Sequence, residues 1–295
     1  MKEYRYQLDN TSKKFRCPYC GKKTYVRYKD FLDGSFLPYE YGRCDREIKC
    51  GYFQKYNGGK DIPKVIPFRP KMVRIPNYHP YSLVKESMTD NSKNRLVQYL
   101  KKELGETETE EIIKRYGLGT ASDWYNGTIF WQIDHLDNVH AGKIIQYDDK
   151  GKRFGKPNWV HSQLKYKKKI KSFNLEQCLF GLHLIQEDRE KSIGIVESEK
   201  TACVMSVVYP KNIWLATGSL NGLNKSKLLP IRDREIILYP DTGIVHKGAT
   251  PFEKWKLIAM ELRIEDFDIK VSDILEKETT KQQKEEGVDL ADFFI

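Results

Sequence analysis

Residues 192–209 read SIGIVESEKTACVMSVVY, and this stretch decides the fold of the last third of the chain. Apolar residues fill 193–196, a length typical of a buried strand, and residues 200–209 favour a helix. The pattern then repeats, with strands at 213–217, 234–239 and 268–271 and a helix at 250–263. Because strands alternate with helices, the sequence predicts an α/β unit with a mostly parallel sheet over residues 191–295.

Two of these predicted strands end in an acidic residue. IGIVES places Glu197, and EIILYPD places Asp241, directly after an apolar segment. The carboxyl ends of parallel strands meet at one edge of a sheet, where ligands collect. Each acid alone is typical of a helix cap or a surface charge, but two carboxylates at a shared edge suit a hard cation. The sequence therefore predicts a Mg²⁺ or Mn²⁺ site that contains Glu197 and Asp241.

Four of the six cysteines lie within 34 residues near the N-terminus, namely Cys17, Cys20, Cys44 and Cys50. The first pair, in Cys-Pro-Tyr-Cys-Gly, has the spacing of a zinc knuckle, and the second pair has five intervening residues. The N-terminal decapeptide has no apolar segment typical of an export signal, so paired thiolates favour a metal site over disulfides. The sequence predicts one structural zinc ion, against the alternative of four unrelated buried cysteines.

The residues between the two cysteine pairs are typical of a β-hairpin. Segments 24–32 and 35–43 alternate around Asp33-Gly34, a turn signal, so residues 1–60 are predicted to form a zinc β-ribbon. The remaining cysteines, Cys178 and Cys203, lie in apolar runs and are predicted to be core residues.

A middle region of mixed helices and strands is predicted over residues 81–190. Five prolines between positions 61 and 80 predict an extended tether ahead of it. Two helices follow, at 92–104 and after a capping box at 107–110, with Gly117 ending the second. Segments 128–134 and 139–148 then predict a β-hairpin around 135–138.

Positive charge is concentrated in two places. The net charge of the 295 residues is +10, and residues 1–80 alone hold 18 basic and 8 acidic side chains. A second run, 150–171, holds nine lysines and arginines and no acid. Basic runs are often no more than solvated faces, but aromatic residues interleave with the cations in both, which suits base stacking beside phosphate contacts. We therefore expect a nucleic-acid partner.

A membrane location is not expected. The mean hydropathy is −0.65, and no stretch approaches the ~20 apolar residues that a spanning helix needs. We therefore expect a cytoplasmic protein.

The order of these segments resembles a known family. A strand followed by Glu197-Ser-Glu-Lys-Thr-Ala and a helix, with Tyr239-Pro-Asp241 ending a later strand, resembles the Toprim domain of primases, topoisomerases and related nucleases. With a zinc ribbon ahead of it, the chain is similar in layout to the bacterial replicative primase and to primase-like proteins of bacterial mobile elements and phages.

Two further segments carry the resemblance, which covers residues 14–56 and 112–295. The stretch from Tyr116-Gly-Leu-Gly119 to Gly151-Lys-Arg resembles the family's region before Toprim, in which a basic β unit forms one wall of the template groove. Residues 287–293 resemble the closing Gly-x-Asp-x-x-Asp stretch. The individual motifs are short, and their order carries the specificity.

The resemblance implies an activity and a set of site residues. It implies primer synthesis on a single-stranded DNA template by Mg²⁺-dependent nucleotidyl transfer, as in a DNA-directed RNA polymerase, with nucleotides as substrates and a replicative helicase as a partner. Glu197 and Asp241 would be catalytic, and Asp289 would join them on the cation. The expected nucleic-acid contacts are Lys143, Lys152, Arg153, Lys165, Lys167, Lys168 and Lys169.

The chain departs from the family at one position. Catalytic Toprim domains carry Asp-x-Asp after the third strand, and Gly243 stands where the second aspartate is expected. Because two-metal phosphoryl transfer needs several carboxylates, Glu199, Asp289 or Asp292 would have to replace it. Lys200 would hold a phosphate or pair with Glu197. Two alternatives stay open: a non-catalytic DNA-binding protein with a degenerate Toprim domain, and a Toprim nuclease.

Overall fold

The computed structural model describes residues 4–46, 48–58, 75–246 and 248–295, in two compact units, Met1–Arg74 and Ile75–Ile295. The predicted proline-rich tether lies outside the described residues as far as position 74. Its last residues belong to the second unit, because the His79 N–H donates to the Val139 carbonyl at 2.8 Å.

The first unit is a small antiparallel sheet. Its strands are β1 (Tyr6–Leu8), β2 (Phe15–Arg16), β3 (Lys23–Asp30), β4 (Gly42–Cys44) and β5 (Phe53–Gln54). They lie in the order β1-β3-β4-β5, with β2 also paired to β3. The predicted hairpin is confirmed in its first arm, β3, and in the antiparallel pairing of its return arm, but the return arm is not one continuous strand. The return arm is an isolated bridge at Phe36 and then β4, because Pro38 has no N–H to donate and a turn follows it.

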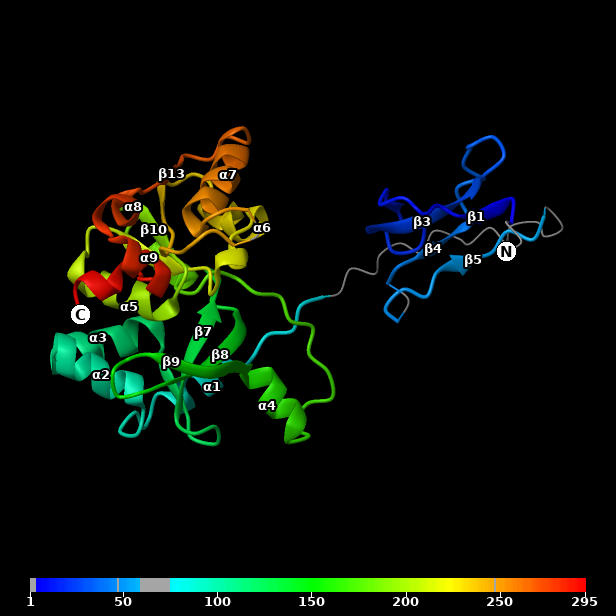
Figure 1. Cartoon of the computed structure of the whole chain (residues 1–295). Helices are drawn as coiled ribbons and strands as arrows, with labels where there is room; N and C mark the ends of the chain where they lie inside the picture. Colours follow the sequence, from blue (N-terminus) through cyan, green and yellow to red (C-terminus); the bar gives the residue numbers. More distant parts are fainter. Residues whose placement is uncertain (1–3, 47, 59–74, 247) are drawn as a thin grey trace. The chain divides into compact units, whose positions relative to one another are not determined.

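The second unit begins with three helices and an antiparallel sheet (Figure 1). The elements are α1 (Tyr81–Ser87), α2 (Arg95–Leu104), α3 (Glu106–Tyr116), β6 (Gly119–Ala121), β7 (Gly127–Ile133), β8 (Val139–Tyr147), β9 (Arg153–Trp159) and α4 (Val160–Tyr166). The four strands pair in sequence order as a meander. The predicted hairpin between 128 and 148 is therefore confirmed as β7 and β8.

The helix boundaries in this part differ from the prediction. Helix α2 starts three residues late, because Asn94 is its N-cap and accepts a hydrogen bond from the Val97 N–H at 3.3 Å. The predicted capping box at 107–110 is wrong, since α3 begins at Glu106 directly after Gly105 and no side chain caps it. Gly117 ends α3 in the left-handed conformation (φ 64°), as predicted.

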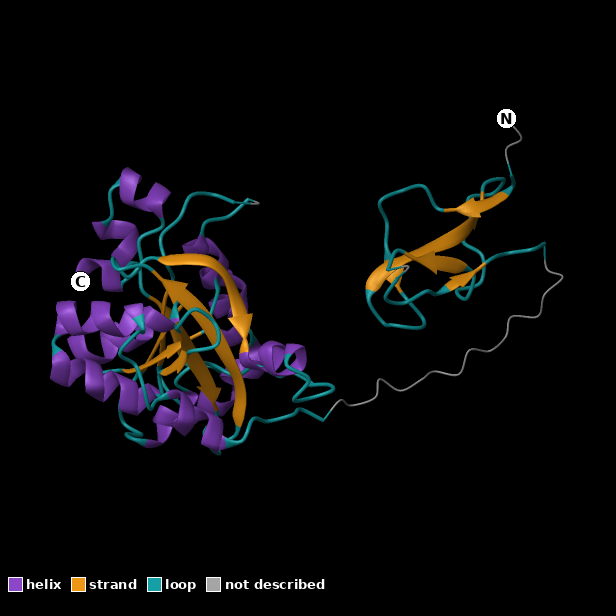
Figure 2. Ribbon diagram, turned by 90° about the horizontal axis from the view of Figure 1, so that it is seen from below, coloured by secondary structure: helices purple, strands orange, loops and turns teal. Residues whose placement is uncertain are grey.

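The rest of the second unit is built on a parallel sheet. Its strands are β10 (Ile193–Val196), β11 (Ile213–Ala216), β12 (Ile236–Tyr239) and β13 (Ile269–Val271), in the order β11-β10-β12-β13. All three pairings are parallel, so the predicted parallel sheet is confirmed. Figure 2 shows helices around the strands of this unit. These helices are α5 (Glu199–Val208), α6 (Lys225–Leu228), α7 (Pro251–Arg263), α8 (Ile274–Glu278) and α9 (Lys281–Glu286).

Short 3-10 helices complete the unit, at Leu182–Gln186, Leu220–Gly222, Leu229–Ile231 and Ala291–Phe293. In the described parts of the chain, no helix combines the length and the apolar character that crossing a bilayer requires.

The antiparallel half and the parallel half of the second unit share one hydrophobic core. Buried residues from Leu96 on α2 to Ala291 near the C-terminus belong to the same cluster, which includes Cys178 and Cys203 as predicted. Tyr116 at the end of α3 links the halves, because its hydroxyl donates to the Trp214 carbonyl on β11 at 3.0 Å. The sheets that carry the candidate site are therefore held in one packed body.

Candidate functional site

The four predicted zinc ligands come together in the first unit. Their sulfur atoms all lie within 4.8 Å of one another, and no other set of three or more potential ligands does so among the described residues. Cys17 and Cys50 are 3.7 Å apart at their sulfurs, and Cys20 and Cys44 are 3.9 Å apart. A tetrahedral zinc site with Zn–S bonds of about 2.3 Å has sulfurs about 3.8 Å apart. The cluster therefore fits a structural zinc ion.

Local backbone geometry positions these cysteines. The Gly21 N–H donates to the Cys17 carbonyl at 2.8 Å, and the left-handed Gly21 (φ 68°) closes the turn that carries Cys17 and Cys20. Cys44 ends strand β4, and the Cys50 N–H donates to the Arg46 carbonyl at 2.7 Å in a second turn. The first turn thus presents Cys17 and Cys20, and the end of β4 with the second turn presents Cys44 and Cys50, at the same end of β3.

The two predicted catalytic acids lie on one edge of the parallel sheet. Glu197 follows β10 and Asp241 follows β12, and these strands are neighbours in register from Ile193 with Ile236 onward. Both acids line a cavity of about 690 Å³. Asp289 and Asp292, from the last residues of the chain, line the same cavity. The structure therefore brings together acids that the sequence places nearly one hundred positions apart.

Glu197 is buried and Asp241 is half-buried, and one carboxylate oxygen of each lacks a partner. Glu197 Oε1 and Asp241 Oδ1 are both removed from solvent without a hydrogen-bond partner. Burial raises the pKa of Glu197 to about 7, against a backbone hydrogen bond from Asp241 that lowers it. Burial, followed by the charge of Glu197, raises the pKa of Asp241 well above its usual range. Buried carboxylates without partners are costly, and a cation that binds both removes the cost.

The chain's last segment places a third acid here. The Thr242 N–H donates to the Val288 carbonyl at 2.9 Å, which holds that segment beside the residue after Asp241. Asp289 accepts a hydrogen bond of 2.6 Å from the Thr201 hydroxyl on α5. Burial raises the pKa of Asp289, while the charge of Lys200 lowers it.

These acids fit a hard divalent cation. Mg²⁺ is bound in proteins by oxygen ligands, with one or two carboxylates and several retained waters. The free oxygens of Glu197 and Asp241 meet that requirement, and Asp289 lies in the same cavity. Glu197 and Asp241 are the residues that would hold the ion.

Positive side chains line the same cavity as the acids. Lys152 and Arg153, at the start of β9, and Lys200 on α5 are among its lining residues. Lys200 Nζ lies 3.8 Å from Asp292 Oδ1, so Lys200 pairs with Asp292 and not, as one alternative predicted, with Glu197. An anion that enters the cavity therefore meets positive charge from the start of β9 and from helix α5.

Lys143 and Glu199 form a buried ion pair in the lining of this cavity. Lys143 Nζ donates to both carboxylate oxygens of Glu199, at 2.9 and 3.0 Å, and to the Gly218 carbonyl at 2.8 Å. The two side chains are 7% and 2% exposed. All three N–H groups of the lysine are in use, which corrects the prediction of Lys143 as a nucleic-acid contact and of Glu199 as a replacement cation ligand.

We expect Lys143→Met to destabilise the second unit strongly. The change leaves the Glu199 carboxylate buried without its counter-charge, which costs about 3–5 kcal/mol. The free energy of unfolding in urea measures the loss. The double variant Lys143→Met/Glu199→Leu should recover much of it, because no isolated charge stays buried. A loss below about 1 kcal/mol in the single variant would contradict the buried pair.

Gly243, which replaces the second acid of Asp-x-Asp, is not among the residues that line the cavity. A Cβ atom at this position would lie 2.9 Å from Pro251 Cγ and 3.1 Å from Pro251 Cδ, at the start of α7. An aspartate there requires the proline to move. The local packing at position 243 therefore has no room for an aspartate side chain.

The other predicted basic contacts divide into two groups. Lys152 and Arg153 border the acidic cavity, whereas Lys165, Lys168 and Lys169 are exposed at the end of α4 and do not line it. Lys167 forms an ion pair with Asp123. The basic contacts expected over 150–171 thus fall at the start of β9, where they line the acidic cavity, and at the end of α4, outside it.

Sequence reasoning missed the structural role of Lys143. The available signal was its position in VHAGKIIQY, a lone lysine inside an otherwise apolar strand. Lysine is almost never fully buried unless it is paired, so such a position indicates a buried partner. The partner, 56 residues away, was not predictable from spacing.

Comparisons with solved structures give matches that include the following three chains. The RNA polymerase domain of Mycobacterium tuberculosis primase DnaG in complex with double-stranded DNA has a TM-score of 0.38 at 12% identity, covering 53% of this chain and 60% of that one. A DnaG primase catalytic domain bound to single-stranded DNA has a TM-score of 0.36 at 15% identity, covering 63% and 76%. The primase fragment of the bacteriophage T7 primase-helicase protein has a TM-score of 0.36 at 14% identity, covering 88% of each chain.

Sequence comparisons match the chain to two family models. No curated protein matches the chain. A model of a zinc beta-ribbon finger matches residues 4–62, the part that holds the four clustered cysteines. The model named Domain of unknown function (DUF6371) matches residues 94–242, which is half of the chain and includes Glu197 and Asp241. The chain therefore belongs to the DUF6371 family and carries a zinc β-ribbon ahead of that domain.

Proposed function

We propose that the chain is a primase-like nucleic-acid protein that carries out divalent-cation-dependent nucleotidyl transfer on single-stranded DNA. The observation that carries the proposal is the pair of unpartnered buried carboxylate oxygens of Glu197 and Asp241, in a cavity that basic side chains also line. Acids alone would repel a nucleotide, and basic residues alone would not bind a cation. Their combination suits a substrate that carries phosphates and a metal ion together.

Each group in the cavity has a distinct task in this proposal. Glu197 and Asp241 hold the cation, which when bound polarises the phosphates of an incoming nucleotide. Lys152, Arg153 and Lys200 neutralise the charge that develops on those phosphates during transfer. Lys143 keeps Glu199 neutralised and fixes α5 relative to the antiparallel sheet.

The proposal extends to partners and setting. Single-stranded DNA is the template and nucleotides are the substrates, with a replicative helicase as a further partner. The setting is the replication of a mobile element or a phage. The layout of a zinc ribbon followed by this sheet and its acidic edge supports it.

Primer synthesis tests the proposal. The full chain is incubated with single-stranded DNA, nucleotides and either Mg²⁺ or Mn²⁺, and labelled products are resolved on a denaturing gel. We expect short products that require the cation and the template. Retained template binding without any product under both cations would refute nucleotidyl transfer.

A second function, DNA binding without catalysis, is favoured by one observation. Pro251 packs where the side chain of a second aspartate at position 243 would lie, so a two-metal site of the Toprim type is incomplete. A degenerate domain of this kind would hold DNA for a separate helicase or polymerase. The gel assay separates the two functions, since this one predicts binding without product.

We expect the lysines at the end of α4 to contribute to DNA affinity through phosphate contacts. The variant Lys165→Gln/Lys168→Gln/Lys169→Gln removes three exposed charges and leaves Lys167 with Asp123. The slope of log affinity against log salt on a single strand should flatten by roughly 2, at about 0.7 per contact. Fluorescence anisotropy at several salt concentrations measures it.

A charge-matched variant controls for net charge. Lys211→Gln/Lys256→Gln/Lys281→Gln removes three exposed lysines elsewhere on the second unit and should leave the slope unchanged. Equal slopes for all three proteins would remove the α4 lysines from the binding surface.

A further inference from the structure

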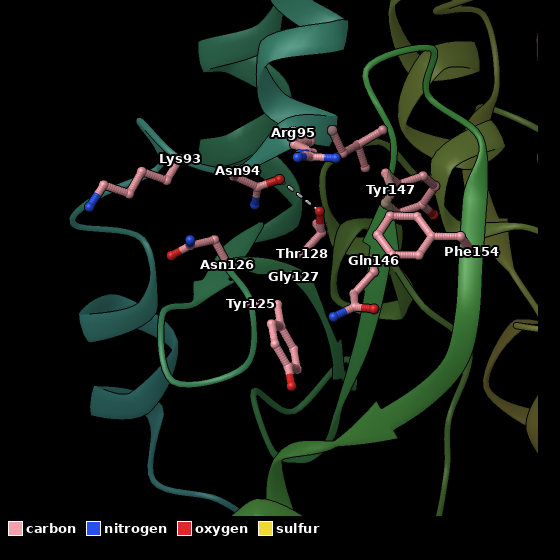
Figure 3. A pocket seen from close by; sticks show the side chains of 11 residues that line it. Lys93, Asn94, Arg95, Tyr125, Asn126, Gly127, Thr128, Gln146, Tyr147 and Phe154 are labelled. Carbon is pink, nitrogen blue, oxygen red and sulfur yellow. Dashed lines mark hydrogen bonds between the residues drawn. The ribbon is translucent and has the colours of Figure 1, made fainter.

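A second cavity, of about 640 Å³, lies at the start of α2, between the loop that joins β6 to β7 and the β8–β9 hairpin (Figure 3). Its lining contains none of the acids of the first cavity and none of the clustered cysteines, and Tyr147 lines both cavities. Six of the lining residues carry the argument, and they are Lys93, Arg95, Tyr125, Asn126, Gln146 and Phe154.

Two aromatic rings at this cavity are open to solvent. Tyr125 is 80% exposed and Phe154 is 47% exposed, although both are large apolar side chains. In Figure 3 the two rings come from different elements, Tyr125 from the loop and Phe154 from β9. Exposed rings beside a cavity suit stacking on a flat base, which is favourable and tolerates any base.

The backbone of the loop is unusual at the first ring. Tyr125 and Asn126 both have positive φ, at 52° and 53°, and the Gly127 N–H donates to the Trp124 carbonyl at 3.0 Å. In a turn of this kind asparagine and glycine are favoured at the central positions, and tyrosine is not. Turn formation therefore does not account for the tyrosine, whose ring is presented at the cavity.

The charge of the cavity favours an anion. Lys93 and Arg95 line it, and no aspartate or glutamate does. The guanidinium of Arg95 lies 3.6 Å from Asp149, but both side chains are mostly exposed, and such pairs are weak. The amides of Asn126 and Gln146 add donors and acceptors that the edge of a base can use.

The polar groups of Asn94, a buried residue of the cavity lining, already have hydrogen-bond partners within the protein. Asn94 is fully buried, and its Oδ1 accepts hydrogen bonds from the Val97 N–H at 3.3 Å and from the Thr128 hydroxyl at 2.8 Å. Its amide group donates to Thr120 Oγ1 at 3.1 Å. A ligand would therefore meet the rings, the cations and the two outer amides.

The β8–β9 hairpin is a wall common to both cavities. Gln146 pairs with Phe154, and Tyr147 pairs with Arg153. Neighbouring residues of a strand point to opposite faces, and accordingly Phe154 lines this cavity while Arg153 lines the acidic one. A chain of nucleotides bound to the hairpin can reach both.

We propose that this cavity is a nucleotide-binding subsite, in which a base stacks on Tyr125 and Phe154 and its phosphate lies near Lys93 and Arg95. The ligand is a nucleotide unit, supplied either by a single strand or as a free nucleotide. The inference rests on the proposed function in so far as the chain handles nucleic acid, and it does not require catalysis.

The test compares stacking with charge in the full chain. Anisotropy of a labelled twelve-residue oligo(dT) is measured against salt, and binding of free ATP and dTMP is measured by calorimetry. Tyr125→Ala/Phe154→Ala should weaken oligonucleotide binding by about tenfold or more without changing the salt slope, because stacking releases no counterions. Lys93→Gln/Arg95→Gln should flatten the slope by roughly 1.4.

Two variants and one measurement serve as controls. Tyr125→Trp/Phe154→Tyr keeps both rings and should bind like the wild type, which separates stacking from misfolding. Tyr81→Ala removes a ring of similar exposure, 45%, on α1 outside this cavity and should have no effect. Circular dichroism of Tyr125→Ala/Phe154→Ala should match the wild type.

The outcomes distinguish the sources and the proposals. Loss of oligonucleotide affinity alone assigns the cavity to a strand, and loss of ATP or dTMP binding alone assigns it to a free nucleotide. Unchanged binding of all probes in Tyr125→Ala/Phe154→Ala overturns this inference and leaves the proposed function standing. A wild-type chain that binds no probe overturns both.

Discussion

Removal of zinc is expected to unfold the first unit and leave the second folded. The buried hydrophobic residues described in the ribbon are few: a cluster of Cys17, Tyr25, Cys44 and Tyr52, two of which are predicted metal ligands, with Val26, Leu37 and Tyr41 besides. A core this small cannot offset the loss of chain entropy, and structural zinc supplies about 10–16 kcal/mol in apparent binding free energy. Limited proteolysis after chelation should cleave residues 4–58 while a fragment of the second unit persists.

Metal analysis and cysteine variants complete this prediction. Purified protein should hold one equivalent of zinc, and Cys17→Ser/Cys44→Ser should hold none. Cys178→Ala, which changes a buried cysteine of the second unit, should retain the metal. Less than half an equivalent in the wild type, or zinc retained by the double variant, would contradict the site.

The second large effect concerns Glu197. Mg²⁺ should raise the melting temperature of the wild type, because it binds the folded acidic cavity and relieves repulsion between Glu197 and Asp241. At one hundred times its dissociation constant the ion contributes about 2.7 kcal/mol, or roughly 5–10 °C for a unit of this size. Glu197→Gln should abolish that gain and lower primer synthesis by at least about a hundredfold.

A control on the neighbouring strand β12 isolates the cation site. Glu235 lies at the opposite end of β12 and pairs with Lys270, so Glu235→Gln should keep both the Mg²⁺ response and synthesis. Glu197→Gln should bind DNA nearly as well as the wild type, since the predicted phosphate contacts lie on other side chains. If Mg²⁺ does not change the melting temperature of the wild type, and the wild type still binds DNA, the result supports the non-catalytic function.

Local patterns explain what the sequence predicted correctly. Four strands and two helices of the parallel half lie within a few residues of their predicted bounds, because apolar runs of strand length alternate there with helical segments. The cysteine cluster and the edge position of Glu197 and Asp241 follow from spacing and from the geometry of parallel strands.

Long-range packing explains what the sequence did not predict. The exclusion of a side chain at Gly243 depends on Pro251, and the role of Lys143 depends on Glu199, and neither contact follows a local period. The start of α3 predicted from the sequence is wrong, because Thr107 and Glu110 match a capping pattern. In the structure the helix begins directly after Gly105. The cavity of Tyr125 and Phe154 joins a loop to a strand and has no sequence motif.

The shared core of the second unit has a consequence for how such chains can be recombined. Leu96, Phe130, Trp214 and Ala291 pack in one cluster, so the antiparallel and parallel halves have matched buried surfaces. A chimera that takes its antiparallel half from one relative and its parallel half from another would join buried surfaces that do not match. Each poorly filled or overfilled contact lowers the free energy of unfolding by about 1–3 kcal/mol. The ribbon has its own buried cluster and can be exchanged whole. We therefore expect the acidic edge and the β9 wall to be exchangeable only together, and the zinc ribbon to be exchangeable on its own.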